Sequence, residues 1–137
     1  MSTLRTNALE GVDAKNSITI VAGAGNITTT NVQEGLNKCW INFDGSGTIA
    51  TRDSFNVSGI TDDSTGRYTV SINNDMSNND YAVLNYTSGS TNSSATAFNN
   101  NFLGGNNLQT GTFAISAYSS SFEDSDVVMA QVTGDLA

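Results

Sequence analysis

The 137-residue sequence contains no histidine and no proline, and Cys39 is its only cysteine. Without histidine, the chain cannot form the Ser–His or Cys–His pairs that activate many nucleophiles, and no other catalytic signature is present. A single cysteine also excludes an intramolecular disulfide. Because Cys39 alternates with Ile41 and Phe43, we expect it to be a buried apolar residue. We therefore expect that the protein is not an enzyme and has no catalytic residues.

Basic residues and long apolar runs are also scarce. The chain has five Lys and Arg residues against 13 Asp and Glu residues, a net charge of −8. Nucleic acid needs clustered Lys and Arg side chains on its phosphates, so we expect no nucleic acid partner. The acidic balance is compatible with a surface kept soluble by its charge or with a basic partner. No apolar run approaches membrane-span length and no signal-peptide core is visible, so we expect no membrane insertion.

The acidic residues gather in two short clusters, Asp62-Asp63 and Glu123-Asp124-x-Asp126. A calcium loop needs alternating oxygen ligands around a central glycine and a distal glutamate, and neither cluster has that spacing. Two carboxylates alone can serve a glycosidase, but such enzymes need a deep cleft that a small domain hardly offers. We expect solvated turns at both clusters, with no metal and no cofactor.

Short polar side chains dominate the amino-acid composition. Charged residues make up only 13% of the chain, about half of the usual share, while Ser, Thr and Asn are abundant. These residues suit turns and the solvent face of strands rather than long helices. The composition therefore predicts an all-β protein.

Apolar and polar residues alternate in short runs that are separated by Gly, Asn and Asp. Cys39, Ile41 and Phe43 form one inward row, and Tyr68, Val70 and Ile72 another. This spacing predicts a small antiparallel β-sandwich over residues 39–137. The expected strands are 39–43, 48–57 with an irregularity around Arg52-Asp53, 67–72, 81–86, an irregular one near 95–102, 112–118 and 127–132.

Residues 1–38 differ from the rest and are predicted to form an extended arm with one short helix. A strand is expected at 17–21 and a loop at 22–27. Thr30 and Gln33 fit a capping box, which predicts a helix over about 31–38. Such an arm cannot bury its own apolar side chains, so we expect it to anchor and oligomerise the protein through Leu4, Leu9, Ile18, Ile20, Val32 and Leu36.

Three aromatic residues fall outside the predicted core rows, on opposite strand faces or at strand ends. They are Trp40, Tyr86 and Tyr118. Aromatic rings stack on the apolar faces of sugars, and neighbouring amides bond to sugar hydroxyls. These residues are candidates for glycan contact, and the alternative interpretations are a second core face or a subunit contact.

Residues 29–70, TTNVQEGLNKCWINFDGSGTIATRDSFNVSGITDDSTGRYTV, are similar to a module of fibre and other virion structural proteins of tailed bacteriophages, many of them marine or cyanobacterial. The opening residues 2–7 share the resemblance, which extends to about residue 86. It implies a non-enzymatic virion component that is a homotrimer and binds other virion proteins, of the capsid or the tail.

Together these observations favour a phage structural protein, of the fibre or capsid-decoration type, located in the virion. The arm would dock to the particle and the β-sandwich would project outward. The alternative is a carbohydrate-binding adhesion module that recognises a host surface glycan.

Overall fold

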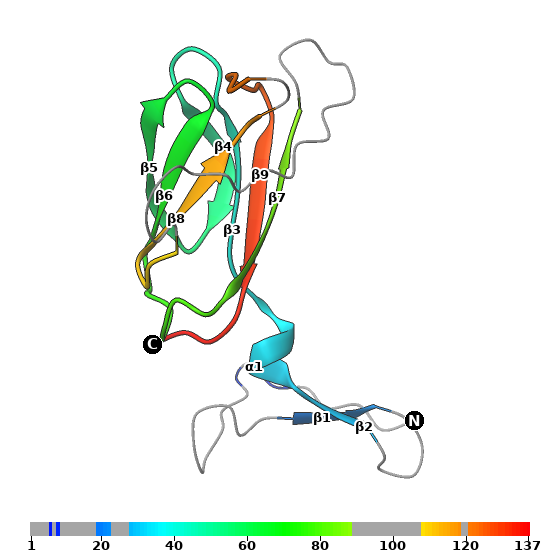
Figure 1. The fold of residues 1–137 in the computed structure, drawn as a ribbon. Coiled ribbons are helices and arrows are strands. Elements are labelled where there is room, and N and C mark those ends of the chain that lie inside the picture. The colour runs from blue at the N-terminus through cyan, green and yellow to red at the C-terminus, as the bar shows by residue number, and fades with distance from the viewer. Residues whose placement is uncertain (1–5, 7, 9–18, 23–27, 89–107, 119–120) are drawn as a thin grey trace. The chain divides into compact units, whose positions relative to one another are not determined.

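The computed structural model describes residues 6, 8, 19–22, 28–88, 108–118 and 121–137 (Figure 1). The chain divides into two compact units, Met1–Leu36 and Asn37–Ala137. The sequence prediction put this division between residues 38 and 39.

The first unit contains a two-stranded antiparallel sheet and a single helical turn. Strand β1 (Thr19–Ala22) pairs with β2 (Thr28–Asn31), and α1 (Val32–Gly35) follows directly. The predicted helix over 31–38 is therefore too long. Glycine is a poor helix former, and the chain beyond Gly35 is recruited into a strand that begins at Asn37 and pairs with Thr133.

The second unit is a sandwich of two antiparallel sheets, and the predicted all-β sandwich fold is confirmed (Figure 1). The first sheet has the order β4-β3-β9-β7, and the second has the order β5-β6-β8. The strands are β3 (Asn37–Asp44), β4 (Ala50–Phe55), β5 (Val57–Ser64), β6 (Arg67–Ile72), β7 (Ala82–Thr87), β8 (Thr112–Ser116) and β9 (Val128–Thr133).

The core lies between the two sheets and consists of the inward rows that the alternation predicts. Cys39, Ile41 and Phe43 of β3 are buried. They meet rows from β6, β8 and β9 in one continuous cluster. Full burial of such a side chain stabilises the fold by roughly 1.5–3 kcal/mol before entropy costs. The buried rows on these three strands are Tyr68, Val70, Ile72, Phe113, Ile115, Val128, Ala130 and Val132.

The predicted strand over 48–57 is wrong, because the chain changes sheets within it. Strand β4 ends at Phe55 and β5 begins at Val57 in the other sheet, with Asn56 at a φ of 56° between them. Asparagine tolerates this left-handed conformation better than most residues. The predicted irregularity is confirmed, since the pairing of β3 with β4 skips Arg52.

The remaining predictions hold with shifted boundaries. The turn expected at Asp62-Asp63 lies further along the chain, because β5 continues to Ser64 and Gly66 reverses the chain at a φ of 66°. The strand expected at 81–86 runs over 82–87, and that expected at 127–132 runs over 128–133. The irregular strand expected near 95–102 lies outside the described residues.

Candidate functional site

The four-stranded sheet turns one face to the core and presents the other to solvent. Since Cys39, Ile41 and Phe43 point inward, Trp40 and Asn42 point outward. The register places the outward residues side by side. In one row Trp40 pairs with Phe55 on one side and with Gln131 on the other, and Gln131 pairs in turn with Leu84. In the next row Asn42 pairs with Met129, and Met129 pairs with Tyr86. We call these seven residues the outer face: Trp40, Asn42, Phe55, Leu84, Tyr86, Met129 and Gln131.

Large apolar side chains gather on this outer face rather than scatter over the surface. Phe55, Leu84 and Tyr86 expose 53%, 59% and 47% of their area, and Met129 exposes 37%. These four are the exposed large apolar residues in the part of Asn37–Ala137 that the structure describes. Contiguous apolar exposure of this kind marks an interaction site, whereas single exposed residues need no explanation.

The second sheet has a different outer surface. On β6 the inward row leaves Arg67, Thr69 and Ser71 on the outside. Thr69 donates its hydroxyl to the carboxylate of Asp63 on the neighbouring strand at 2.6 Å. The sandwich is therefore two-sided, with a polar face on β6 and an apolar one on β3, β9 and β7.

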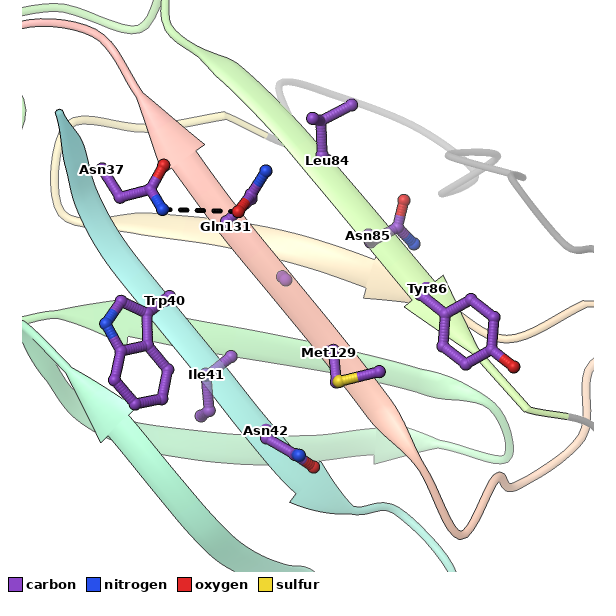
Figure 2. Close-up of a pocket in the computed structure, with 10 residues that line it drawn as sticks. Asn37, Trp40, Ile41, Asn42, Leu84, Asn85, Tyr86, Met129 and Gln131 are labelled. Atoms are coloured by element: carbon purple, nitrogen blue, oxygen red, sulfur yellow. Dashed lines mark hydrogen bonds between the residues drawn. The ribbon is translucent and has the colours of Figure 1, made fainter. Parts of the chain in front are cut away.

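The outer face contains an open hollow of about 650 Å³ (Figure 2). Figure 2 shows Trp40 on β3 and Tyr86 on β7, with Met129 on the strand between them. The described residues of the lining are mostly apolar, and no Lys, Arg, Asp or Glu is among them. A hollow of this volume falls in the size range of small-molecule sites.

Side-chain amides supply the polar groups of the hollow. The Asn37 Nδ2 group donates to Gln131 Oε1 at 3.3 Å, as the dashed line in Figure 2 marks. Asn42 Oδ1 is buried without a hydrogen-bond partner among the described residues. Side-chain amides and aromatic rings therefore line one surface, which suits the binding of a ligand.

The structure brings together two of the three aromatic residues predicted for glycan contact. Trp40 and Tyr86 line the same hollow. Tyr118 follows β8 in the other sheet, where its ring packs edge to face on Phe122 at 5.0 Å and Arg67 lies 3.9 Å from the Phe122 ring centre. Sequence reasoning missed Phe55, Leu84 and Met129, although alternation with buried neighbours was a signal for the latter two.

The residues predicted for the assembly arm are only partly described. Leu4, Leu9 and Ile18 lie outside the described residues. Ile20 lies on β1 opposite Thr30. Val32 in α1 is half-buried, and Leu36 exposes 57% of its area. Their assembly role stays a prediction.

Asp124 of the 123–126 cluster has a structural role, because its carboxylate bonds to β6 and to the turn before it. Gly66 N donates to Asp124 Oδ1 at 2.8 Å, and the Tyr68 hydroxyl lies 3.4 Å from the same oxygen. Among the described residues, no group of three or more Cys, Asp and Glu side chains is placed to hold a metal ion. Burial raises the pKa of the Cys39 thiol to about 11, so the thiol is protonated at neutral pH.

Comparison with protein families, with curated proteins and with solved structures finds no match. In the described part of the chain, no helix has the length and apolar character needed to span a membrane.

Proposed function

We propose that this chain is a non-enzymatic structural protein of a tailed-bacteriophage particle, of the fibre or capsid-decoration type. In this proposal the N-terminal segment docks to the particle and the β-sandwich projects outward. The protein acts by binding, as a homotrimer and with other virion proteins, and is located in the virion.

The observation that carries a binding role is the apolar outer face. A sandwich can leave the solvent side of a sheet polar, as this protein does on β6, so the exposed Phe55, Leu84 and Tyr86 are not required by the fold. Aromatic residues and methionine on a surface with few charges are typical of the centre of an interface. The face therefore supports a protein that functions by attachment.

The assignment to a phage particle depends on the resemblance of residues 29–70. In the structure this segment runs from β2 through α1 into β6 and includes the corner at Asn56. Three of its strands, β3, β4 and β6, carry residues of the core rows or of the outer face. The homotrimer and the virion partners are likewise inferred from the resemblance.

Immunogold labelling of particles purified from the encoding phage tests this proposal. The antibody is raised against residues 39–137, and particles lacking the protein serve as the control. Label over the capsid supports a decoration protein, and label confined to the tail supports a fibre. Absence of label on intact particles contradicts an outward-projecting sandwich. Sedimentation equilibrium of the purified full chain tests the homotrimer, and a monomer at all concentrations contradicts it.

A further inference from the structure

We infer that the hollow between Trp40 and Tyr86 binds an uncharged oligosaccharide. The inference deepens the function proposed above and depends on it for its setting, since a projecting particle protein meets the glycans of a host surface. It assigns the ligand class and the residues that contact it.

The two rings are spaced for an extended ligand. Trp40 pairs with Gln131 on β9, and Tyr86 pairs with Met129 on the opposite side of that strand. The rings thus stand two strands apart and two residues apart along the sheet. Strand spacing and rise place their Cα atoms about 10 Å apart in one direction and about 7 Å in the other. A chain of a few sugar rings spans this diagonal, with Met129 beneath its middle.

The polar groups of the hollow match hydroxyls. Gln131 Oε1 accepts from Asn37 Nδ2, and both of these amides line the hollow together with Asn85. Amides present donors and acceptors at once, and a hydroxyl also does both. An apolar protein surface would offer no hydrogen-bond partner to the amide groups of this lining, at a cost for each of them.

The charge distribution selects a neutral ligand. The whole chain has a net charge of −8, yet none of the described residues that line the hollow is Lys, Arg, Asp or Glu. An acidic saccharide or a nucleic acid would find no cation among these residues, while the net negative charge of the chain would repel it. A neutral sugar needs no cation and is not repelled by negative charge, and it gains contact with the rings of Trp40 and Tyr86.

Trp40 is the single tryptophan of the chain and lies in the hollow, so its fluorescence reports on occupancy. The full chain is titrated with maltohexaose, cellohexaose and N-acetylchitohexaose, and with trigalacturonic acid as an anionic comparison. Concentrations reach about 10 mM, which nearly saturates a site with a Kd of about 1 mM. Tyr86→Ala and Tyr86→Leu remove the second ring but keep the reporter. Thr69→Ala, on the outer surface of the other sheet, is the matched control.

We expect at least one neutral oligosaccharide to shift Trp40 emission saturably, Tyr86→Ala to weaken its binding about tenfold, and Thr69→Ala to leave it unchanged. No shift with any neutral probe overturns the inference, as does a response to trigalacturonic acid alone. Emission that changes with protein concentration, together with a larger sedimenting mass, also overturns it, because a second copy then covers the face. Particle labelling tests the proposed function independently, so labelled particles without sugar binding contradict this inference alone.

Discussion

Phe43 of the four-stranded sheet and Tyr68 of the three-stranded sheet meet edge to face, with ring centres 5.2 Å apart and ring planes at 82°. Both side chains are fully buried. The Tyr68 hydroxyl extends past this contact and donates to Gly45 O at 3.1 Å, just beyond the end of β3. Gly45 has no room for a side chain, since a Cβ atom there would lie 2.5 Å from the Tyr68 hydroxyl oxygen. Together these contacts join the two sheets at one end of the sandwich.

Phe43→Ala should destabilise the protein by about 3–5 kcal/mol, because it removes a buried ring and leaves a cavity between the sheets. Tyr68→Phe keeps the ring contact and loses only the hydroxyl, so it should cost about 1 kcal/mol. Urea denaturation followed by circular dichroism measures both. The control is Phe55→Ala, which truncates a 53% exposed ring. Equal losses for Phe43→Ala and Phe55→Ala would contradict the described core.

Asn56→Ala should cost about 2–4 kcal/mol, because Asn56 holds the corner between the sheets. Its Nδ2 group donates to Lys38 O at 2.9 Å and Asn74 O at 3.1 Å, and its Oδ1 atom accepts from Asn74 N at 2.8 Å. Alanine loses these bonds and also strains at a φ of 56°. Asn56→Gly loses the same hydrogen bonds, but glycine adopts this φ without strain, so it should be the milder change. Thermal unfolding checks the order, and an Ala variant as stable as the Gly variant would argue against a left-handed corner.

Gly66→Ala should destabilise the protein far more than Gly47→Ala, although both glycines have a positive φ near 60°. A Cβ atom at Gly66 would lie 2.6 Å from Ala117 O and 2.7 Å from Glu123 N, both backbone atoms that cannot move aside freely. At Gly47 nothing lies within 4 Å, so only the backbone strain of roughly 1 kcal/mol remains. Chemical denaturation of the two variants separates crowding from strain. Similar losses at both sites would mean that the turn at Gly66 is open.

Stability should fall as pH rises through alkaline values, in part because of Cys39. Its thiol has a pKa of about 11 in the folded protein against 9.0 for an ordinary thiol. Between these values the folded state keeps a proton that the unfolded state has lost, so the contribution present below pH 9 declines until about pH 11. Burial acts on Tyr81 in the same sense and raises its pKa to about 12.

Urea denaturation from pH 8 to 11 measures this decline in the free energy of unfolding, with each protein compared with itself at pH 8. The decline should be on the order of 1 kcal/mol smaller in Cys39→Ala than in the natural sequence. The native thiol should also be inert to Ellman's reagent and react fully only in denaturant, because it is completely buried. Rapid reaction of the folded protein would place Cys39 outside the core.

Tyr86→Ala should change the free energy of unfolding by no more than about 0.5 kcal/mol, since the side chain is 47% exposed and lies on the outer face. The same variant is expected to bind oligosaccharide about tenfold more weakly, so unchanged stability separates a ligand contact from a core residue. Calorimetric melting checks this, with Tyr81→Ala as the comparison, because Tyr81 is buried and donates to Gln109 O at 2.7 Å. Unfolding of Tyr86→Ala would make Tyr86 a core residue.

The strands that are simplest in pattern were also the easiest to predict. Residues 39–43 and 67–72 alternate strictly, and their inward rows are the buried ones in the structure. The helix over 31–38 was predicted from a capping box and from Val32 and Leu36 one helical turn apart. The chain instead joins a strand at Asn37, which pairs with Thr133, so the helix is shorter. The corner at Asn56 has no glycine or proline beside it, and one asparagine in a chain rich in asparagine is a weak turn signal.

Only part of the candidate site could be predicted from the sequence. Trp40 and Tyr86 stand out as aromatic residues outside the core rows, but Tyr118 has the same appearance and belongs to the other sheet. Which of the three share a surface depends on strand order, and strand order depends on pairing between residues far apart in the chain. Met129 became part of the site only because β9 lies between β3 and β7.

By itself the sequence determined the all-β class and which side chains face the core, because alternation with a period of two is a local property of a strand. It also determined the absence of histidine chemistry and of a disulfide. Only the tertiary structure decided that Trp40, Met129 and Tyr86 form one apolar surface and that the chain crosses between sheets at Asn56. Those outcomes depend on long-range hydrogen-bond register, which no short stretch of residues contains.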